Sequence, residues 1–331
     1  MSKKQCKELN LRAAAKFFKK RNNFAILTHS SPDGDTLGAA YALYYGLKEM
    51  GKTAEVLCPD IIPSKYSYFA VTTDHIKSDD LTVVAVDVAD NKLFGALDAE
   101  FGGKVELCID HHVSNVRYAD NLLLDSKASA ACEIIYELLK KLKVNINDVT
   151  AKALYTGIAT DTGCFKYSNV TAKTHLIASE LIKYDINAAE INRIMFDTKS
   201  KRLLQLERMV LDTAEYHFDD KCILLCVTAA MQEKTGCSGP DLEGIAVISR
   251  SVEGVLAGIT VKQIGDREFK ISLRTFEPLD GAAICGSLGG GGHKAAAGVT
   301  LEGTLEEVKA KILAAVGEGM EKANVWSSAD K

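Results

Sequence analysis

Short apolar runs alternate with longer segments of helical periodicity through the first half of the chain. Four runs have the length and apolar content of strands buried on both faces: Phe24–Thr28, Ala54–Leu57, Leu81–Val88 and Lys104–Ile109. Four longer segments repeat apolar residues at helical spacing: Thr36–Met50, Ala128–Leu142, Val149–Thr160 and Ala172–Tyr184. This alternation predicts an α/β domain with an open, mostly parallel sheet.

The second half of the chain carries a different pattern. Its first part, Ala188–Tyr216, is helical and rich in charged residues, which is typical of a connector between domains. We then expect a strand at Lys221–Thr228, a helix at Asp241–Ser251 and a hairpin formed by Val255–Gln263 and Glu268–Phe276. A glycine cluster follows at Gly286–Gly292, and a last helix at Thr304–Gly317. The predicted organisation is an open-sheet domain of residues 1–187, a helical linker of residues 188–213 and a smaller α/β domain of residues 214–331.

Composition and charge narrow the class of protein. The chain has 331 residues, of which 47% are hydrophobic and 25% charged, and this suits about two globular domains. Its net charge of −4 provides no overall positive field for a long polyanion, so we expect a short nucleic-acid partner rather than a long duplex. No apolar run reaches ~18 residues, so no membrane span is expected.

The N-terminal stretch and the cysteines indicate the cellular compartment. The basic, amphipathic stretch Lys3–Lys20 contains Glu8 and lacks an apolar core, so it predicts an ordinary first helix rather than a targeting segment. The nine cysteines form no C-x-x-C pair, which favours a reducing cytoplasm.

Acidic residues and histidines gather where the predicted strands and helices end. In chain order they are His29, Asp33 and Asp35 in the pattern H-x-x-x-D-x-D, then Asp87, then Asp110-His111-His112, then Asp161. Ligands of open α/β sheets bind at the carboxyl edge of the strands, so we expect these side chains to share one site. Gly34 is expected to let the backbone turn tightly between Asp33 and Asp35.

Each cluster also has an ordinary structural explanation. The acids after the first strand could cap the next helix, Asp87 could end a strand, and the histidine pair could be structural. Together, six or seven such ligands at one edge carry too much negative charge unless cations balance it. Carboxylate and imidazole ligands without thiolate favour Mn²⁺, with Mg²⁺, Co²⁺ or Fe²⁺ as alternatives, over a closed Zn²⁺ site. Two ions ~3.5–4 Å apart would share a carboxylate and activate water for attack on a phosphate ester.

The motifs resemble those of the DHH phosphoesterase family, in the same order. They are His29-Ser-Ser-Pro-Asp33-Gly-Asp35, Val86-Asp87, Asp110-His111-His112 and Thr160-Asp161-Thr162-Gly163. The resemblance implies two metal-ligand sets that share Asp87: His29, Asp33 and Asp87 in one, and Asp35, Asp87, His111 and Asp161 in the other. It also implies catalytic roles for Asp110, His111 and His112, with His112 facing the substrate phosphate and Asp110 orienting the histidines.

A glycine-rich run near the end of the chain gives a second candidate site. It is not a Walker loop, because Gly292 is followed by His293 and Lys294 instead of the Lys-Ser/Thr ending. The run resembles the G-G-G-H motif of the DHH-associated C-terminal domain, which implies substrate contacts from Gly290, Gly291, Gly292, His293 and Lys294. Arg274, on the preceding predicted strand, is expected to grip a terminal phosphate.

Within the family, the chain resembles the group of bifunctional oligoribonucleases and 3′-phosphoadenosine-5′-phosphate (pAp) phosphatases. The features that carry this likeness are the length, the stretch Thr160–Asn169 and the compact second domain. It implies a cytoplasmic two-metal phosphodiesterase and phosphatase that degrades short single-stranded RNA to mononucleotides and dephosphorylates pAp, and it is compatible with a homodimer.

Other functions stay open. Hydrolysis of cyclic or linear dinucleotides (c-di-AMP, pApA or pGpG) is the first alternative, and a catalytically inactive nucleotide-binding module is the second. A manganese pyrophosphatase would lack the glycine-histidine pattern of the second domain. A dinucleotide-cofactor dehydrogenase would need glycines where the first loop carries acids.

Overall fold

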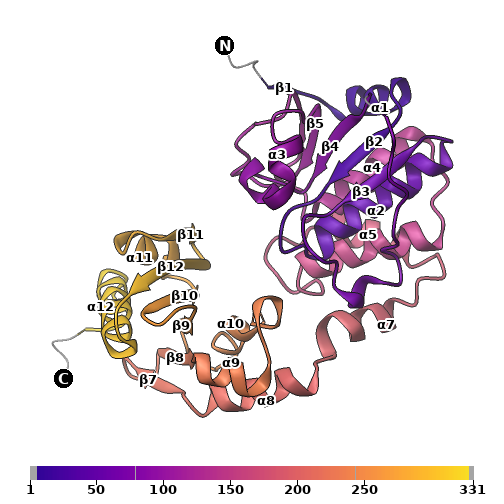
Figure 1. The fold of residues 1–331 in the computed structure, drawn as a ribbon. Helices are drawn as coiled ribbons and strands as arrows, with labels where there is room; N and C mark the ends of the chain where they lie inside the picture. Colours follow the sequence, from indigo (N-terminus) through magenta and orange to yellow (C-terminus); the bar gives the residue numbers. More distant parts are fainter. Residues whose placement is uncertain (1–5, 79, 243, 328–331) are drawn as a thin grey trace. The chain divides into compact units, whose positions relative to one another are not determined.

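The apolar runs of the first half pair into one parallel sheet (Figure 1). Its strands lie in the order β1-β6-β5-β4-β2-β3, and each neighbouring pair is parallel. Their bounds are β1 (Lys7–Glu8), β2 (Phe24–Leu27), β3 (Ala54–Leu57), β4 (Thr82–Val86), β5 (Leu107–Asp110) and β6 (Asn121–Leu124). Because the strands share one direction, the residues that follow β2, β4 and β5 emerge at the same edge of the sheet.

This sheet belongs to the first of two units into which the chain divides, Met1–Thr198 and Lys199–Lys331. The computed structural model describes residues 6–78, 80–242 and 244–327. The predicted linker, residues 188–213, is divided between the two units, and its role as a linker stays a prediction.

Helices cover the first sheet mainly on one face. The helical elements of this unit are α1 (Leu11–Lys20), α2 (Gly34–Glu49), η1 (Ser64–Tyr66), η2 (Asn91–Leu97), α3 (Asp98–Phe101), α4 (Ala131–Leu142), α5 (Asp148–Asp161), α6 (Ala172–Leu181), α7 (Ala188–Asn192) and η3 (Arg193–Asp197). In β2, Phe24 and Ile26 join the core that includes α1, α2, α4 and α5. The alternate residues Ala25 and Leu27 join a smaller core with η2 and α3 on the other face. The two-residue period thus places apolar side chains on both faces.

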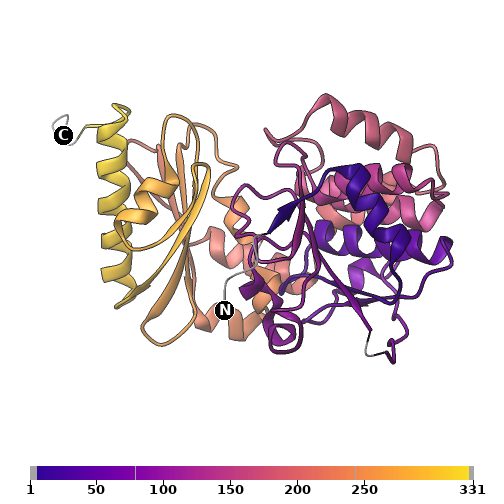
Figure 2. The same ribbon diagram turned by 90° about the horizontal axis from the view of Figure 1, so that it is seen from above.

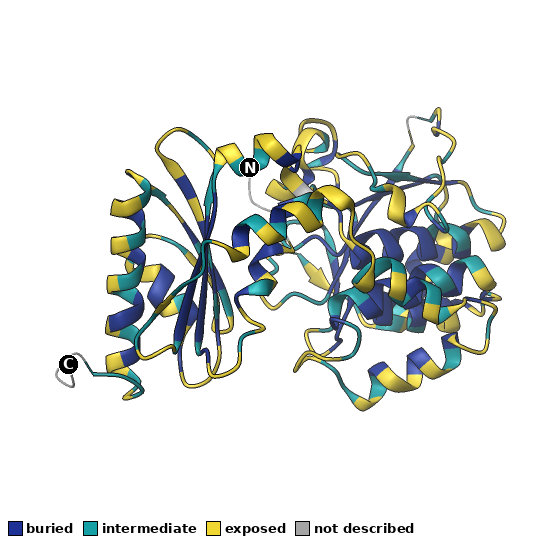
Figure 3. Ribbon diagram, turned by 90° about the horizontal axis from the view of Figure 1, so that it is seen from below, coloured by how far each residue is buried: buried dark blue, intermediate teal, exposed yellow. Residues whose placement is uncertain are grey.

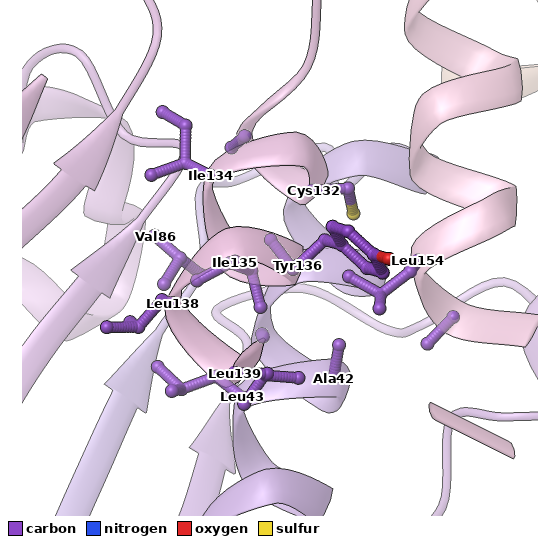
Figure 4. Packing of buried hydrophobic residues seen from close by; sticks show 14 of the residues in the cluster. Ala42, Leu43, Val86, Cys132, Ile134, Ile135, Tyr136, Leu138, Leu139 and Leu154 are labelled. Atoms are coloured by element: carbon purple, nitrogen blue, oxygen red, sulfur yellow. The ribbon is translucent and has the colours of Figure 1, made fainter. Parts of the chain in front are cut away.

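Helix α4 is the centre of the larger core. Ile135, Leu138 and Leu139 are almost fully buried, and the close view shows side chains from α2, β4 and α5 around the helix (Figure 4). The buried colour extends over the strands and the inner helices, while the outer helices are largely exposed on one side (Figure 3). The core thereby fixes where α4 begins, close to the edge of the sheet that carries the acidic residues.

The second unit contains a mixed sheet in the order β11-β12-β10-β9-β8-β7. Its strands are β7 (Glu215–His217), β8 (Cys222–Val227), β9 (Ala257–Gln263), β10 (Glu268–Thr275), β11 (Gly291–His293) and β12 (Ala296–Glu302). Only β8 and β9 are parallel among the described strand pairs of this sheet. Its helices are α8 (Lys201–Leu211), α9 (Ala229–Thr235), η4 (Gly239–Leu242), α10 (Ile245–Ile248), α11 (Gly281–Ser287) and α12 (Leu305–Lys322).

The helices of the second unit lie on both faces of its sheet. Helix α12 runs along one face together with α11 (Figure 2), and α8 and α10 pack on the other. The α/β class of both units is confirmed, as are the strand at Lys221–Thr228, the hairpin of β9 and β10, and the closing helix.

Three of the predicted helices were wrong in extent. The first begins at Leu11, because the side chain of Asn10 caps it and Lys7–Glu8 pair with β6; residues 3–5 lie outside the described residues. The segment Ala188–Tyr216 ends in β7, and its helical part is interrupted by the π-helical turn η3. Instead of one helix, Asp241–Ser251 contains the end of η4 and the short helix α10, and residue 243 lies outside the described residues.

Candidate metal centre

The predicted site residues of the first unit lie where the sheet and its helices end. His29 follows β2, Asp87 follows β4, and Asp110 is the last residue of β5. Asp33 is the N-cap of α2 and accepts hydrogen bonds from the N–H groups of Asp35 (2.9 Å) and Thr36 (3.0 Å). Asp33 therefore caps α2, which is the ordinary structural role that the sequence also allowed for it.

Three overlapping groups of side chains have possible ligand atoms within 4.8 Å of one another. They are His29, Asp33 and Asp87; Asp35, His111 and Asp161; and Asp87, His111 and His112. Asp87 lies between the histidines: its Oδ2 is 3.8 Å from His29 Nε2, and its Oδ1 is 3.5 Å from His111 Nε2. His111 Nε2 is also 3.4 Å from Asp161 Oδ2 and 3.9 Å from Asp35 Oδ2. The fold therefore brings together all six residues predicted as metal ligands.

Asp87 has an unusual backbone conformation. Its φ of 58° lies in the left-handed region, which is costly for residues other than glycine. Strand β5 and the loop before β6 hold this part of the backbone: the Asp87 N–H donates to Ile109 O (2.8 Å), and the carbonyl of Val88 accepts a hydrogen bond from the Tyr118 hydroxyl (2.9 Å). The structure thus stabilises a strained conformation that aims this carboxylate at both histidines.

Burial and mutual repulsion make three of the carboxylates, Asp35, Asp87 and Asp161, hard to ionise in the absence of a cation, since the pKa of each is raised. Burial, together with the nearby charges of Asp35, Asp33 and Asp161, raises the pKa of Asp87 well above its usual range. Burial and the charges of Asp35 and Asp33 raise the pKa of Asp161 to about 8. Two buried carboxylates, Asp35 and Asp87, beside the partly buried Asp161 are stable as anions only if positive charge compensates them.

The unpartnered atoms fit divalent cations. Among the described residues, Asp87 Oδ1 and His111 Nε2 are buried and have no hydrogen-bond partner. Buried polar atoms are nearly always satisfied, so a carboxylate oxygen and an imidazole nitrogen that face one another without a partner are suited to metal coordination. The donor set of oxygen and imidazole nitrogen agrees with hard to borderline ions.

The ring nitrogens of the histidines are oriented by other groups. His111 Nδ1 lies 3.1 Å from Ala128 O and donates to it, so in the neutral imidazole Nε2 is the acceptor nitrogen, and it faces the carboxylates. His112 Nδ1 lies 2.8 Å from Asp110 Oδ1. Burial works to raise the pKa of Asp110, but the hydrogen bond and charge of His112 hold that pKa below its usual value. Asp110 thus orients His112 directly, and it accepts the backbone N–H of His111.

Several residues of the site were not predicted from the sequence. Asn115 donates from Nδ2 to Asp110 Oδ2 (2.6 Å), and the N–H groups of Ala131 and Cys132 donate to the carboxylate of Asp35 (2.5 and 2.9 Å). The first turn of α4 has no side-chain cap of its own, and Asp35 takes the place of one. Of these residues, only Asn115 has a signal in the sequence, because it is a polar residue three positions after His112 in a motif.

The glycine between the two acids has a different role from the one expected. Gly34 is the first residue of α2 and does not have positive φ. A Cβ at this position would lie 2.3 Å from Thr160 Oγ1. Gly34 is therefore needed because α2 approaches the end of α5 closely, and not because the backbone turns there.

The predicted substrate residues of the second unit lie at one end of its sheet. His293 on β11 pairs with Ala296 on β12, which pairs with Arg274 on β10. Directly opposed residues of antiparallel strands point to the same face, so His293 and Arg274 share a face, two strand spacings or ~10 Å apart. Lys294 differs, since its ammonium group is paired with Glu277 (2.9 Å).

The glycines beside His293 allow close packing of β11 on β12. A Cβ on Gly290 would lie 2.3 Å from Gly298 O, and one on Gly292, which has φ 141°, would lie 2.6 Å from Ala296 O. Gly291 has no atom within 4 Å of such a Cβ. Two of the three predicted glycines are thus required by backbone approach within the sheet.

Comparison with known proteins supports one family. The model described as "DHH family, N-terminal domain" matches residues 23–158. The chain is 31% identical to the bifunctional oligoribonuclease and PAP phosphatase NrnA of Thermus thermophilus. The similarity extends over 307 residues, which is 90% of each chain. No helix within the described ranges is long and apolar enough to cross a membrane.

Two solved structures have a similar fold. An exopolyphosphatase-related protein from Bacteroides fragilis has a TM-score of 0.82 at 24% identity, over 94% of this chain and 95% of that one. RecJ from Thermus thermophilus in complex with Mn²⁺ has a TM-score of 0.53 at 17% identity, over 92% of this chain and 54% of RecJ. With the matched domain, the 31% identical relative and the order of the motifs, the chain belongs to the DHH family of phosphoesterases.

Proposed function

We propose that this protein degrades very short single-stranded RNA to mononucleotides and also removes a phosphate from pAp, using two divalent cations, Mn²⁺ first. The observation that carries the proposal is the position of Asp87: its Oδ2 faces His29, and its Oδ1 faces His111, the histidine that also lies near Asp35 and Asp161. The relative with 31% identity supports the substrate class, because its name describes these two activities. The Mn²⁺ complex of RecJ, which has a similar fold, supports the choice of ion.

Two sets of residues would hold the cations. His29, Asp33 and Asp87 form one set, and Asp35, Asp87, His111 and Asp161 form the other. When bound, divalent ions polarise a phosphoryl oxygen and lower the pKa of water, so that a nucleophile is available at neutral pH. No side chain is then required as a covalent nucleophile.

The remaining residues bind and orient the substrate in this proposal. Asp110 holds His112 Nδ1, so the opposite nitrogen, Nε2, is directed away from Asp110 and can contact a phosphate oxygen. The His112 side chain is 40% exposed, which leaves it accessible to a ligand. In the second unit, Arg274 and His293 would bind the terminal phosphate and the adjoining nucleotide from their shared face.

Charge and cysteine chemistry support the expected partners and compartment. The net charge of −4 favours short substrates over long duplexes. The nine cysteines are all free thiols, as expected in the reducing cytoplasm where we place the protein. A homodimer stays a prediction that sedimentation of the purified protein would test.

The decisive test is a time course with chelator-stripped protein, with and without added Mn²⁺. The substrates are 5′-labelled RNAs of two to about twenty-five nucleotides, and pAp in parallel. We expect Mn²⁺-dependent loss of the shortest RNAs and release of phosphate from pAp. Asp87→Asn should be inactive, while Asp74→Asn, the same change on an exposed side chain, should behave as the wild type.

Other outcomes would redirect the assignment. Cleavage of pApA or c-di-AMP, without activity on longer RNA or pAp, would make the protein a dinucleotide phosphodiesterase. Mn²⁺ binding without hydrolysis of any of these substrates would contradict the proposal and favour an inactive nucleotide-binding module.

A further inference from the structure

A five-residue segment, Ala128–Cys132, contacts the metal centre at several points, and we refer to it as the positioning segment. The carbonyl of Ala128 accepts from His111 Nδ1. The N–H groups of Ala131 and Cys132 donate to both oxygens of Asp35. One short stretch of backbone therefore orients two of the predicted metal ligands.

The middle of the positioning segment is joined to a third ligand through Asn169. The Ser129 hydroxyl, in a residue that is 1% exposed, donates to Asn169 O (2.6 Å). In return, Asn169 Nδ2 donates to Ser129 O (3.1 Å) and to Asp161 O (3.1 Å). Asp161 is the last residue of α5, where helix carbonyls lack partners within the helix, so Asn169 satisfies the carbonyl of a predicted metal ligand.

The direction of these hydrogen bonds is determined by the available protons. A carbonyl can only accept, so the hydrogen of the Ser129 hydroxyl is used by Asn169 O. Ser129 Oγ and Thr174 Oγ1 are 2.6 Å apart. Because the Ser129 hydrogen is already used, the Thr174 hydroxyl must donate to Ser129 Oγ in this contact. Both amide hydrogens of Asn169 are used by carbonyls, which also fixes the orientation of the amide. The network has one consistent arrangement, in which Ser129 and Asn169 hold each other.

We propose that Ser129 and Asn169 are positioning residues of the metal centre, which keep Asp161 in register with Asp35 and His111. The inference rests on the proposed function in that these three residues are taken as ligands of the cations. Ser129 fixes the backbone between the carbonyl that orients His111 and the N–H groups that hold Asp35. Asn169 ties that backbone to the end of α5, so the ligands from three separate parts of the chain keep one geometry.

The test measures Mn²⁺ binding directly, by titration calorimetry and by the electron paramagnetic resonance of free Mn²⁺. The variants are Ser129→Ala and Asn169→Ala. The matched controls are Ser179→Ala, whose hydroxyl bonds only within its own helix turn in the described contacts, and Asn91→Ala, whose amide bonds to Asp98 on the surface. Loss of groups that orient metal ligands typically weakens metal binding by about 10–100-fold, and we expect this range for both variants and no change for the controls.

The double variant sharpens the test. Since the two residues act through one reciprocal contact, Ser129→Ala with Asn169→Ala should weaken Mn²⁺ binding about as much as the stronger single variant does. In steady-state assays, kcat on a short RNA should fall at fixed Mn²⁺ while KM is nearly unchanged, and excess Mn²⁺ should recover part of kcat.

A merely structural role predicts a different result. Ser129→Ala and Asn169→Ala would then lower thermal stability, yet the folded protein would bind Mn²⁺ within about twofold of the wild type, and this would overturn the proposal. Asn169 is exposed, so its variant keeps the test decisive if Ser129→Ala does not fold. Wild-type protein that binds Mn²⁺ but cleaves no RNA would contradict the proposed function alone, whereas wild-type protein that binds no divalent cation would overturn both.

Discussion

The substitution Asp161→Asn should raise the stability of the metal-free protein and reduce the stabilisation that the protein gains from bound Mn²⁺. In the metal-free protein, the pKa of Asp161 is raised to about 8, mainly by burial and then by the charges of Asp35 and Asp33. A carboxyl group whose pKa is higher in the folded state loses stability as the pH rises from its unfolded pKa, ~4, to its folded pKa. Metal-free wild type should therefore become less stable between about pH 4 and pH 8.

The size of the effect follows from the shift. Each pKa unit corresponds to ~1.4 kcal/mol, so a shift of about four units sets an upper bound of ~6 kcal/mol above pH 8. The side chain is 29% exposed, and water reduces this bound. We expect Asp161→Asn to raise the free energy of unfolding at pH 8 by ~2 kcal/mol in the absence of metal, or ~4–8 °C in the melting temperature of a unit of this size.

Thermal melts at pH 5, 6.5 and 8, each with chelator and with Mn²⁺, would measure both effects. At pH 8 with chelator the variant should melt higher than the wild type, and at pH 5 the difference should become small. With Mn²⁺ at about 100 times its Kd, the wild type should gain ~2.7 kcal/mol, and the variant much less because it lacks one predicted ligand. Asp74→Asn controls for the loss of one surface charge. A variant that melts lower than the wild type in chelator at pH 8 would refute the reasoning.

Three further predictions concern single residues. Asp87→Ala should abolish hydrolysis, because both predicted ligand sets lose a member; near-normal turnover with Mn²⁺ would refute the two-metal centre. Arg274→Ala should raise KM and lower kcat/KM of short RNA at least tenfold, with the bound metal unchanged by elemental analysis; loss of metal would show that the roles of the two units were assigned wrongly. Gly157→Ala would place a Cβ 2.2 Å from Cys132 Sγ and 2.8 Å from Asp35 Oδ1, so it should weaken Mn²⁺ binding and lower stability by ~1–3 kcal/mol in thermal melts. Gly103→Ala, where a Cβ meets no atom within 4 Å, is its control, and equal effects of the two would contradict the steric argument.

Much of the candidate metal centre could be predicted from the sequence, because its position depends on the order of strands and motifs along the chain. Apolar runs end where His29, Asp87 and Asp110 begin, and parallel strands bring such ends to one edge whatever their order in the sheet. Short elements with weak patterns were harder. The two-residue strand Lys7–Glu8 is exposed, and only its pairing with β6 makes it a strand. The helix predicted at Asp241–Ser251 had apolar residues but formed only short turns.

The sequence by itself determined the α/β class, the candidate ligands and the approximate position of most long helices and buried strands, since hydrophobic periodicity and motif spacing are local properties. Tertiary structure decided which groups hold those ligands. Asp35 is held by the N–H groups at the start of α4, about a hundred residues later in the chain, and Asp161 is linked to the same segment through Asn169. Backbone N–H and carbonyl groups are present at every residue, so no sequence pattern distinguishes those that will face a carboxylate or an imidazole. Only the packing of α4 against α2 and α5 makes that selection.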